Sequence, residues 1–282
     1  MKFEGEKQPN QESVGECGVR VHPACVILIV LLVSIALPMY LRTIDGYNQA
    51  RLSLGIDFLL ISHPLLRVII VLLGYFVVRQ MMERSTRDCL TLGLMIGSRR
   101  VWLGIGLGLI CTVPMLAIGL MGGISEGVDY RYLYQGTLVA AFNEELAFRA
   151  FGFGLLVQAA RMKLWPAAVV TGILFGAIHI DFTPSETETI WDQLNVFLLL
   201  TTLGGVLYAW LFHRTRFNLW FVMSIHFFMN LWWAVLDVDG SFMGGIGATL
   251  SRVLCVTMAI LLSIYLYPGA STIGDDSTAE HS

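Results

Sequence analysis

Three charged residues interrupt an apolar stretch near the middle of the chain. Glu144, Glu145 and Arg149 lie within residues 140–152, which are otherwise apolar enough to cross a bilayer. A charged side chain at the centre of a membrane helix costs about 2.5–3.5 kcal/mol on insertion scales, so such residues usually face the interior of a helix bundle and serve a function. On a helix, Glu145 and Arg149 are i,i+4 neighbours that can pair, whereas Glu144 lies about 100° further round. The spacing predicts that Arg149 neutralises Glu145 and that Glu144 is left to react.

Two later apolar segments carry matching polar residues. His179 follows Phe175 by four positions, and Asn230 follows His226 by four, so each pair shares one helical face. A carboxylate, two imidazoles and an amide are the groups needed to activate a water and to stabilise an oxyanion. We therefore predict that Glu144 is the general base and that His179 holds the same water or passes its proton to the leaving amine. His226 and Asn230 are the predicted oxyanion donors, and Phe175 shapes the pocket beside His179.

The three motifs resemble those of a known family, the CPBP intramembrane proteases. EExxxR begins at Glu144, FxxxH at Phe175 and HxxxN at His226, in that order and on separate apolar segments, and the resemblance covers about residues 135–235. The family includes the type 2 CAAX prenyl endopeptidases and the Abi proteins of bacteria. The resemblance implies an intramembrane endopeptidase that cleaves membrane-associated protein or peptide substrates without a cofactor. Ala150 departs from the family, where Gly commonly follows the arginine, and we expect this change to affect packing only.

The resemblance also implies that both glutamates matter. We assign Glu145 a supporting role that extends to positioning the substrate, and Arg149 a structural one. Two histidines and a glutamate match the ligand count of a catalytic zinc site, but the sequence contains no HExxH motif. The resemblance favours a metal-free glutamate mechanism, with zinc as the alternative.

Composition indicates a polytopic all-α membrane protein. Hydrophobic residues make up 56% of the chain, charged residues only 14%, and the mean hydropathy is +0.69, whereas soluble proteins contain about 25% charged residues. The sequence contains no basic patch with interleaved aromatic residues, and nucleic acid is therefore not an expected partner. Five scattered cysteines without a CxxC pair are expected to be small buried residues.

Hydropathy predicts about eight transmembrane helices that enclose a polar active-site cavity. They are expected at about residues 25–41, 58–78, 101–121, 134–158, 164–180, 190–212, 217–236 and 248–267. Residues 25–267 form a single membrane-embedded domain, flanked by disordered tails at 1–24 and 268–282. Lysine and arginine alternate between successive loops, so the positive-inside rule predicts that both termini are cytoplasmic. In a prokaryote, the membrane would be the plasma or inner membrane.

Two other function classes fit the same residues less well. A non-proteolytic membrane scaffold, chaperone or regulator on the same fold would not need the intact set of Glu144, Glu145, His179, His226 and Asn230. A proton-coupled transporter also uses intramembrane carboxylates and histidines, but no inverted repeat is visible. The sequence leaves open whether the substrate is prenylated and to which membrane face the site opens.

Overall fold

The computed structural model describes residues 21–41, 58–94, 99–128, 133–180, 190–238 and 245–268 of the 282-residue chain. This part of the chain is helical and contains no strand beyond an isolated bridge between Ile124 and Leu236, which confirms the predicted all-α class. The predicted tails lie almost entirely outside the described residues. The predicted domain limits therefore stay predictions.

The described residues fold into helices with the following bounds. In chain order they are α1 (Pro23–Leu41), α3 (Phe58–Met81), α4 (Arg84–Cys89), α5 (Arg99–Cys111), α6 (Val113–Gly122), η1 (Leu133–Val139), α8 (Ala140–Glu144), η2 (Glu145–Phe153), α9 (Gly154–Gln158), α10 (Leu164–Ala177), α11 (Ile190–Asn195), η3 (Val196–Thr202), α12 (Leu203–Arg214), α13 (Leu219–Val235) and α14 (Ile246–Leu266). The three η elements are wider π-helical turns, which occur often at functional sites. Two of them flank α8, the short helix that ends at Glu144.

A helical segment lies at each of the eight predicted positions, but the number of eight spans is not confirmed. By length and composition, four helices within the described residues can cross a membrane: Pro23–Leu41, Pro64–Met81, Val196–Arg214 and Ile246–Leu266. The bent pair α5–α6 makes a fifth if it is counted as one span. The helices α10 and α13 have 14 and 17 residues, fewer than the roughly 20 that a bilayer requires. The run from η1 to α9 is long enough but contains three charged residues.

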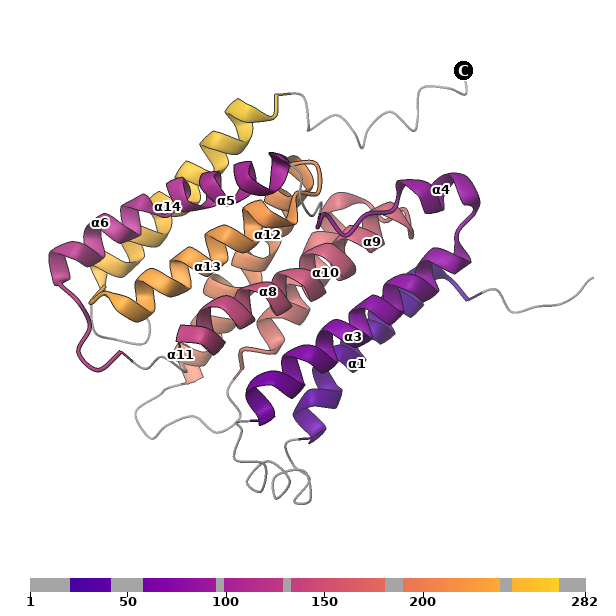
Figure 1. Cartoon of the computed structure of the whole chain (residues 1–282), viewed down its shortest axis with the longest axis horizontal. Helices are drawn as coiled ribbons and strands as arrows, with labels where there is room; N and C mark the ends of the chain where they lie inside the picture. The colour runs from indigo at the N-terminus through magenta and orange to yellow at the C-terminus, as the bar shows by residue number, and fades with distance from the viewer. Residues whose placement is uncertain are drawn as a thin grey trace, which may run out of the picture.

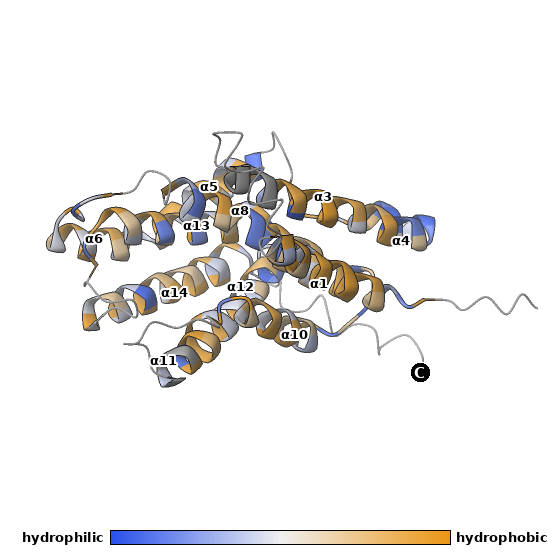
Figure 2. Ribbon diagram, turned by 90° about the horizontal axis from the view of Figure 1, so that it is seen from below, coloured by the Kyte–Doolittle hydropathy of each residue, from blue (hydrophilic) through white to orange (hydrophobic). Residues whose placement is uncertain are grey.

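The outward faces of these helices suit a lipid environment. Large apolar side chains are exposed along several of them, among them Leu73, Phe76, Trp102, Ile173 and Leu261, and in Figure 2 the ribbons of α1, α3 and α10 are mostly apolar whereas α4 is hydrophilic. A soluble monomer rarely exposes so much contiguous apolar surface. The chain is therefore an integral membrane protein. The orientation of its termini stays a prediction.

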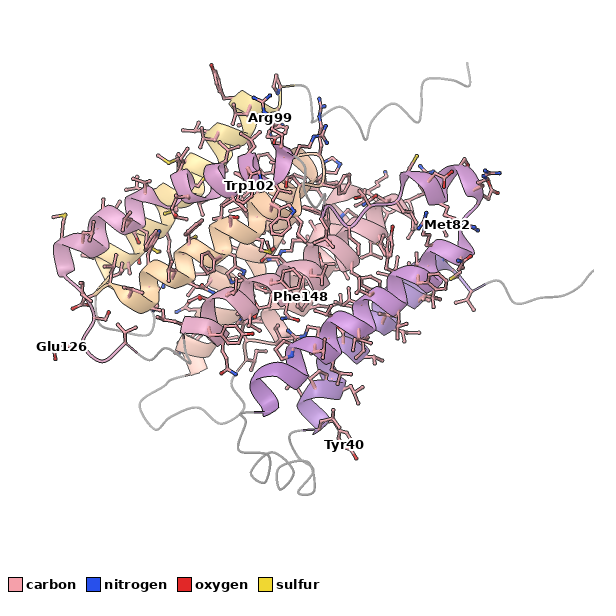
Figure 3. The ribbon with its side chains drawn as sticks, viewed as in Figure 1. Tyr40, Met82, Arg99, Trp102, Glu126 and Phe148 are labelled. Atoms are coloured by element: carbon pink, nitrogen blue, oxygen red, sulfur yellow. The ribbon has the colours of Figure 1, made fainter. Side chains whose placement is uncertain are left out.

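The segment from η1 to α9 lies at the centre of the bundle (Figure 1). The paired helices α1 and α3 pack against it on one side, α13 lies on another, and α10 and α12 also contact η2. Figure 3 shows Phe148 of η2 in the middle of the molecule, with Tyr40 and Glu126 towards one end and Met82 and Arg99 towards the other. All nine residues of η2 are buried. Its charged residues are therefore enclosed by other helices.

The helix α13 is attached to α5 and α6 at both of its ends. At its start, Asn218 caps the helix by accepting a bond from Trp220 N at 3.1 Å, while its Nδ2 donates to Arg100 O at 3.1 Å. At its end, Ser125 N donates to Val235 O at 2.9 Å. Between them, Trp232 Nε1 donates to Thr112 Oγ1 at 3.1 Å, where α5 and α6 meet at a 44° bend. These bonds fix the position of the helix that carries the HxxxN motif.

Close packing also positions α10. A Cβ atom at Gly172 would lie only 2.9 Å from Thr202 O and 2.8 Å from Val206 Cγ2. The absent side chain therefore lets α10 approach η3 and α12 closely. His179 follows directly after the end of α10, so this contact helps to place the FxxxH motif against the central segment.

Candidate active site

Glu144 and Glu145 are neighbours in sequence but differ in surroundings. The carboxylate of Glu145 is fully buried, and its Oε2 lies 3.2 Å from Arg149 Nε, which is the predicted ion pair. The two atoms are close but poorly aligned, so this contact is an ion pair and not a hydrogen bond. The side chain of Glu144 is 15% exposed. The structure therefore separates a buried, paired carboxylate from an accessible one, as the helical spacing predicts.

His226 is held by the buried glutamate. Its Nδ1 lies 2.8 Å from Glu145 Oε1. Because an ionised carboxylate can only accept a hydrogen bond, this contact places a proton on Nδ1. The other ring nitrogen, Nε2, lies 3.9 Å from Glu144 Oε2. One glutamate thus orients the imidazole, and the other faces its free end.

His179 is oriented in an equivalent way by the backbone. Its Nδ1 lies 2.7 Å from the carbonyl oxygen of Phe175, one turn earlier. The carbonyl can only accept, so Nδ1 carries the proton here too. The Nε2 atom of His179 lies 3.9 Å from the same oxygen, Glu144 Oε2. Two imidazoles from different helices therefore present Nε2 to one carboxylate oxygen.

The distance of 3.9 Å is too long for a hydrogen bond. Two groups that each lie about 2.8 Å from a shared water oxygen are this far apart when they subtend roughly a right angle at it. Glu144 and the two imidazoles are thus spaced to hold one water between them. The arrangement can remove a proton from that water.

Asn230 lies on the same cavity wall as His226. Its Nδ2 donates to Gly136 O in η1 at 2.9 Å, so α13 is bonded directly to the central segment. An amide nitrogen carries two N–H donors, and this bond uses one of them. The second is the candidate donor to an oxyanion.

Arg149 lies between two aromatic rings. Its Cζ is 4.1 Å from the ring centroid of Phe175 and 5.5 Å from that of Tyr208. The Phe175 ring also packs 4.7 Å from the His179 ring, and the Tyr208 ring lies 6.1 Å from that of His226. Phe175 therefore packs beside His179, as predicted, and it also packs against the guanidinium.

Two cavities meet at this set of residues, and each contains one glutamate. The Glu144 cavity, of about 390 Å³, is lined by polar residues and by apolar residues of α1 and α3; the polar ones are Arg67, Gln135, Asn143, Glu144 and His179. The Glu145 cavity, of about 500 Å³, has polar lining residues from more helices: Glu145, Arg149, His179, Thr201, Tyr208, His226, Asn230, Arg252 and Thr257. His179 lines both. A third, apolar cavity of about 590 Å³ is lined in part by Tyr134, Phe142, Asn143, Trp220 and Phe228.

Several lining residues carry no motif signal in the sequence. Tyr208 sits in an apolar helix, where a tyrosine commonly packs or lies at the membrane interface. Arg252 is six residues into α14, and no motif surrounds it. Arg67, inside α3, is an isolated charge in an apolar run, which is the one signal that points to it. The positions of these residues in the sequence do not indicate which cavity each of them lines.

Histidine and glutamate side chains are also common metal ligands. Among the described residues, no three histidine, cysteine, aspartate or glutamate side chains are arranged to hold a metal ion. We therefore derive no catalytic step through a metal.

The comparisons with known proteins agree with the motifs. Residues 129–232 match the family described as Rce1-like, type II CAAX prenyl endopeptidase Rce1-like, and all three motifs lie inside this range. No curated protein matches the chain. The family implies a protease that acts on a protein or peptide substrate at the membrane. This match over residues 129–232 supports an assignment to the CPBP/CAAX protease family.

Proposed function

We propose that the chain hydrolyses peptide bonds of membrane-associated proteins or peptides with a water molecule activated by Glu144 and His179. The observation that carries this proposal is the convergence of two Nε2 atoms, from His179 and His226, on Glu144 Oε2 at 3.9 Å each. One base and two imidazoles around one water-sized space are suited to general acid–base catalysis. The family match supports a hydrolase acting at the membrane.

In the first step the water oxygen forms a bond to the carbonyl carbon while Glu144 takes a water proton. The carbonyl oxygen becomes an oxyanion and accepts hydrogen bonds from His226 and from the second N–H of Asn230. His226 can donate from Nε2 only when its ring is protonated, because Nδ1 already donates to Glu145. Glu145 therefore acts as a positioning residue for His226.

In the second step the carbon–nitrogen bond breaks. The proton held by Glu144 passes to the leaving amine, directly or through His179, whose Nε2 faces the same oxygen. The products are a new carboxylate on the N-terminal fragment and an amine on the C-terminal fragment. Glu145 is fully buried, so the expected contact between its side chain and the substrate is not part of this proposal.

The experiment is cleavage of an unbiased peptide library, prenylated and unprenylated, by purified wild type and by Glu144→Gln. Each protein is assayed with and without a zinc chelator. We expect cleavage by wild type alone, unaffected by chelation. Loss of activity on chelation that metal restores would replace the glutamate mechanism with a metal-dependent one. If neither protein cleaves any peptide although both are well folded, the proposed protease activity would be contradicted. A non-proteolytic scaffold, chaperone or regulator would then be favoured.

A further inference from the structure

Tyr208 carries a hydroxyl proton that has no strong acceptor within the described part of the chain. Among the described residues, three hydroxyl side chains line the Glu145 cavity: Thr201, Tyr208 and Thr257. Each threonine donates to a backbone carbonyl oxygen of its own helix at 2.8 Å. Tyr208 instead donates to Met229 Sδ at 3.6 Å. Because a thioether sulfur is a weak acceptor, this proton is available to a stronger acceptor in the cavity.

The hydroxyl of Tyr208 lies beside the two predicted oxyanion donors. Its acceptor, Met229, comes three residues after His226 and directly before Asn230 in α13. Residues at i and i+3 are neighbours on a helix surface. All four side chains line the Glu145 cavity. The hydroxyl, carried by α12, therefore lies against the turn of α13 that carries both donors.

Two contacts hold the ring of Tyr208 in place. The ring packs edge-on against the His226 ring, with the centroids 6.1 Å apart and the planes at 83°, and Arg149 Cζ lies 5.5 Å from its centroid. A hydroxyl hydrogen rotates to suit its acceptor while the oxygen stays where the ring places it. A donor fixed in this way needs little reorganisation when negative charge develops nearby.

Packing alone does not require this hydroxyl. A phenylalanine ring would make the same contacts with His226 and Arg149, without a polar group to satisfy, and a poorly satisfied buried hydroxyl is costly. Tyr75 shows the structural use of a tyrosine, since its hydroxyl donates to a backbone carbonyl, Leu90 O, at 3.2 Å. Tyr208 lies within the matched residues 129–232 but outside the three motifs. The motifs therefore assign it no role.

We propose that Tyr208 is a catalytic residue that donates a third hydrogen bond to the oxyanion. This inference rests on the proposed function. When water adds to the scissile carbonyl, the hydroxyl turns from Met229 Sδ to the oxyanion, which is the stronger acceptor. The proton stays on the tyrosine oxygen, so the proton balance of the reaction does not change. Unlike His226, Tyr208 donates in its neutral form.

The first test is steady-state cleavage of a library peptide by wild type and by Tyr208→Phe. The substitution keeps the ring and removes only the hydroxyl. We expect kcat to fall about 10²-fold with KM unchanged, because a donor to the oxyanion acts in the transition state and not in the bound substrate. Unchanged kinetics would overturn the proposal. A rise in KM alone would place the hydroxyl on the bound substrate and would overturn it too.

Tyr75→Phe is the matched control, since it removes a hydroxyl that bonds to the backbone beside α4. It should leave kcat unchanged, and thermal unfolding in detergent is measured for both variants. An equal fall in kcat in both would make the loss structural and overturn the proposal. If Tyr208→Phe does not fold, 3-fluorotyrosine at position 208 keeps the ring and the hydroxyl. Its more acidic hydroxyl should raise kcat, and an unchanged kcat would overturn the proposal.

A phosphinate analogue of the same peptide tests contact with the oxyanion directly. Its tetrahedral phosphorus carries an anionic oxygen in place of the developing oxyanion, so it binds as a transition-state analogue. The inhibition constant should rise in Tyr208→Phe by the factor by which kcat/KM falls, and it should stay at the wild-type value in Tyr75→Phe. Equal inhibition of wild type and Tyr208→Phe would show that the hydroxyl does not touch the oxyanion, and would overturn the proposal.

The same assays separate this inference from the proposed function. If wild type cleaves no peptide, the protease is contradicted and the role of Tyr208 falls with it. If wild type and Tyr208→Phe cleave equally well, the protease stands and only the role of Tyr208 is overturned.

Discussion

The two cavities differ in how their glutamates are held, although the residues are adjacent. Glu145 is fully buried and has close contacts to Arg149 and to His226. Glu144 is partly exposed, and its two imidazole neighbours lie at 3.9 Å. A carboxylate that is fully enclosed and paired can orient its neighbours but has little capacity to react. The comparison shows how the junction of α8 and η2 places two identical side chains in different surroundings.

The largest effect on activity is expected for substitution of Glu144, the accessible glutamate. Glu144→Gln keeps the size of the side chain but removes the base, so kcat should fall about 10²–10⁴-fold. Because the carboxylate is partly exposed and its ion-pair contacts within the described residues, to His179 and His226, are as long as 3.9 Å, thermal stability in detergent should change little. If Glu144→Gln retains activity, the proposal that Glu144 is the reactive glutamate would be contradicted. Glu126→Gln, at the end of the molecule away from the centre (Figure 3), is the control and should remain active.

Substitution of Glu145, the buried glutamate, should mainly lower the stability of the fold. Glu145→Gln leaves the Arg149 guanidinium buried without its counter-charge, and breaking such a pair costs about 3–5 kcal/mol. Unfolding in detergent should therefore occur at a clearly lower temperature than for Glu144→Gln. The double variant Glu145→Leu, Arg149→Met should recover much of the stability without recovering activity. Equal stability of the two single glutamine variants would contradict the assignment.

His226 contacts both glutamates, and its substitution should have the next largest effect on activity. His226→Gln removes the proposed oxyanion donor, and loss of one such donor typically lowers kcat by about 10²–10³-fold. We expect the loss in kcat rather than in KM, measured by steady-state cleavage. His213→Gln, in a helix end of α12, is the control. A change confined to KM would instead indicate a role in binding the substrate.

The smallest effect is expected at Phe175, which packs against Arg149 and His179. Phe175→Leu removes the ring contacts, each worth about 1 kcal/mol, and should lower stability and activity modestly together. Phe153→Leu is the matched control, since Phe153 is fully buried and packs on Phe212. It should lower stability alone. Identical activity in the two variants would show that Phe175 acts only as packing.

Much of this arrangement could be predicted from sequence because it depends on local periodicity. Apolar runs gave the helical segments to within a few residues, and i,i+4 spacing predicted the pair of Glu145 with Arg149. The bend at Thr112 had a sequence signal in Pro114, which sits in the first turn of α6, but the run 101–121 was predicted as one span. A proline of this kind can start a new helix rather than kink an old one.

The features that could not be predicted from sequence depend on contacts between segments that are distant in the chain. No local pattern shows that Glu145 accepts a hydrogen bond from Nδ1 of His226, 81 residues away, so the sequence predicts the oxyanion role without its requirement for a protonated ring. Arg252 and Tyr208 lie in apolar helices without a motif, and only their place in the bundle brings them to the site. The number of membrane spans also needs more than hydropathy, because α10 and α13 are short and apolar.

The attachment of α13 to α5 and α6 has a consequence for motion. A helix bonded at its start, near its end and at Trp232 moves as one rigid body with its supports. His226 and Asn230 therefore lie on a helix with a fixed frame. Amide hydrogen exchange should accordingly be slow and concerted along α5 and α13. Faster exchange in η3 and α14, which also line the Glu145 cavity, would show that this wall of the cavity is the more mobile one.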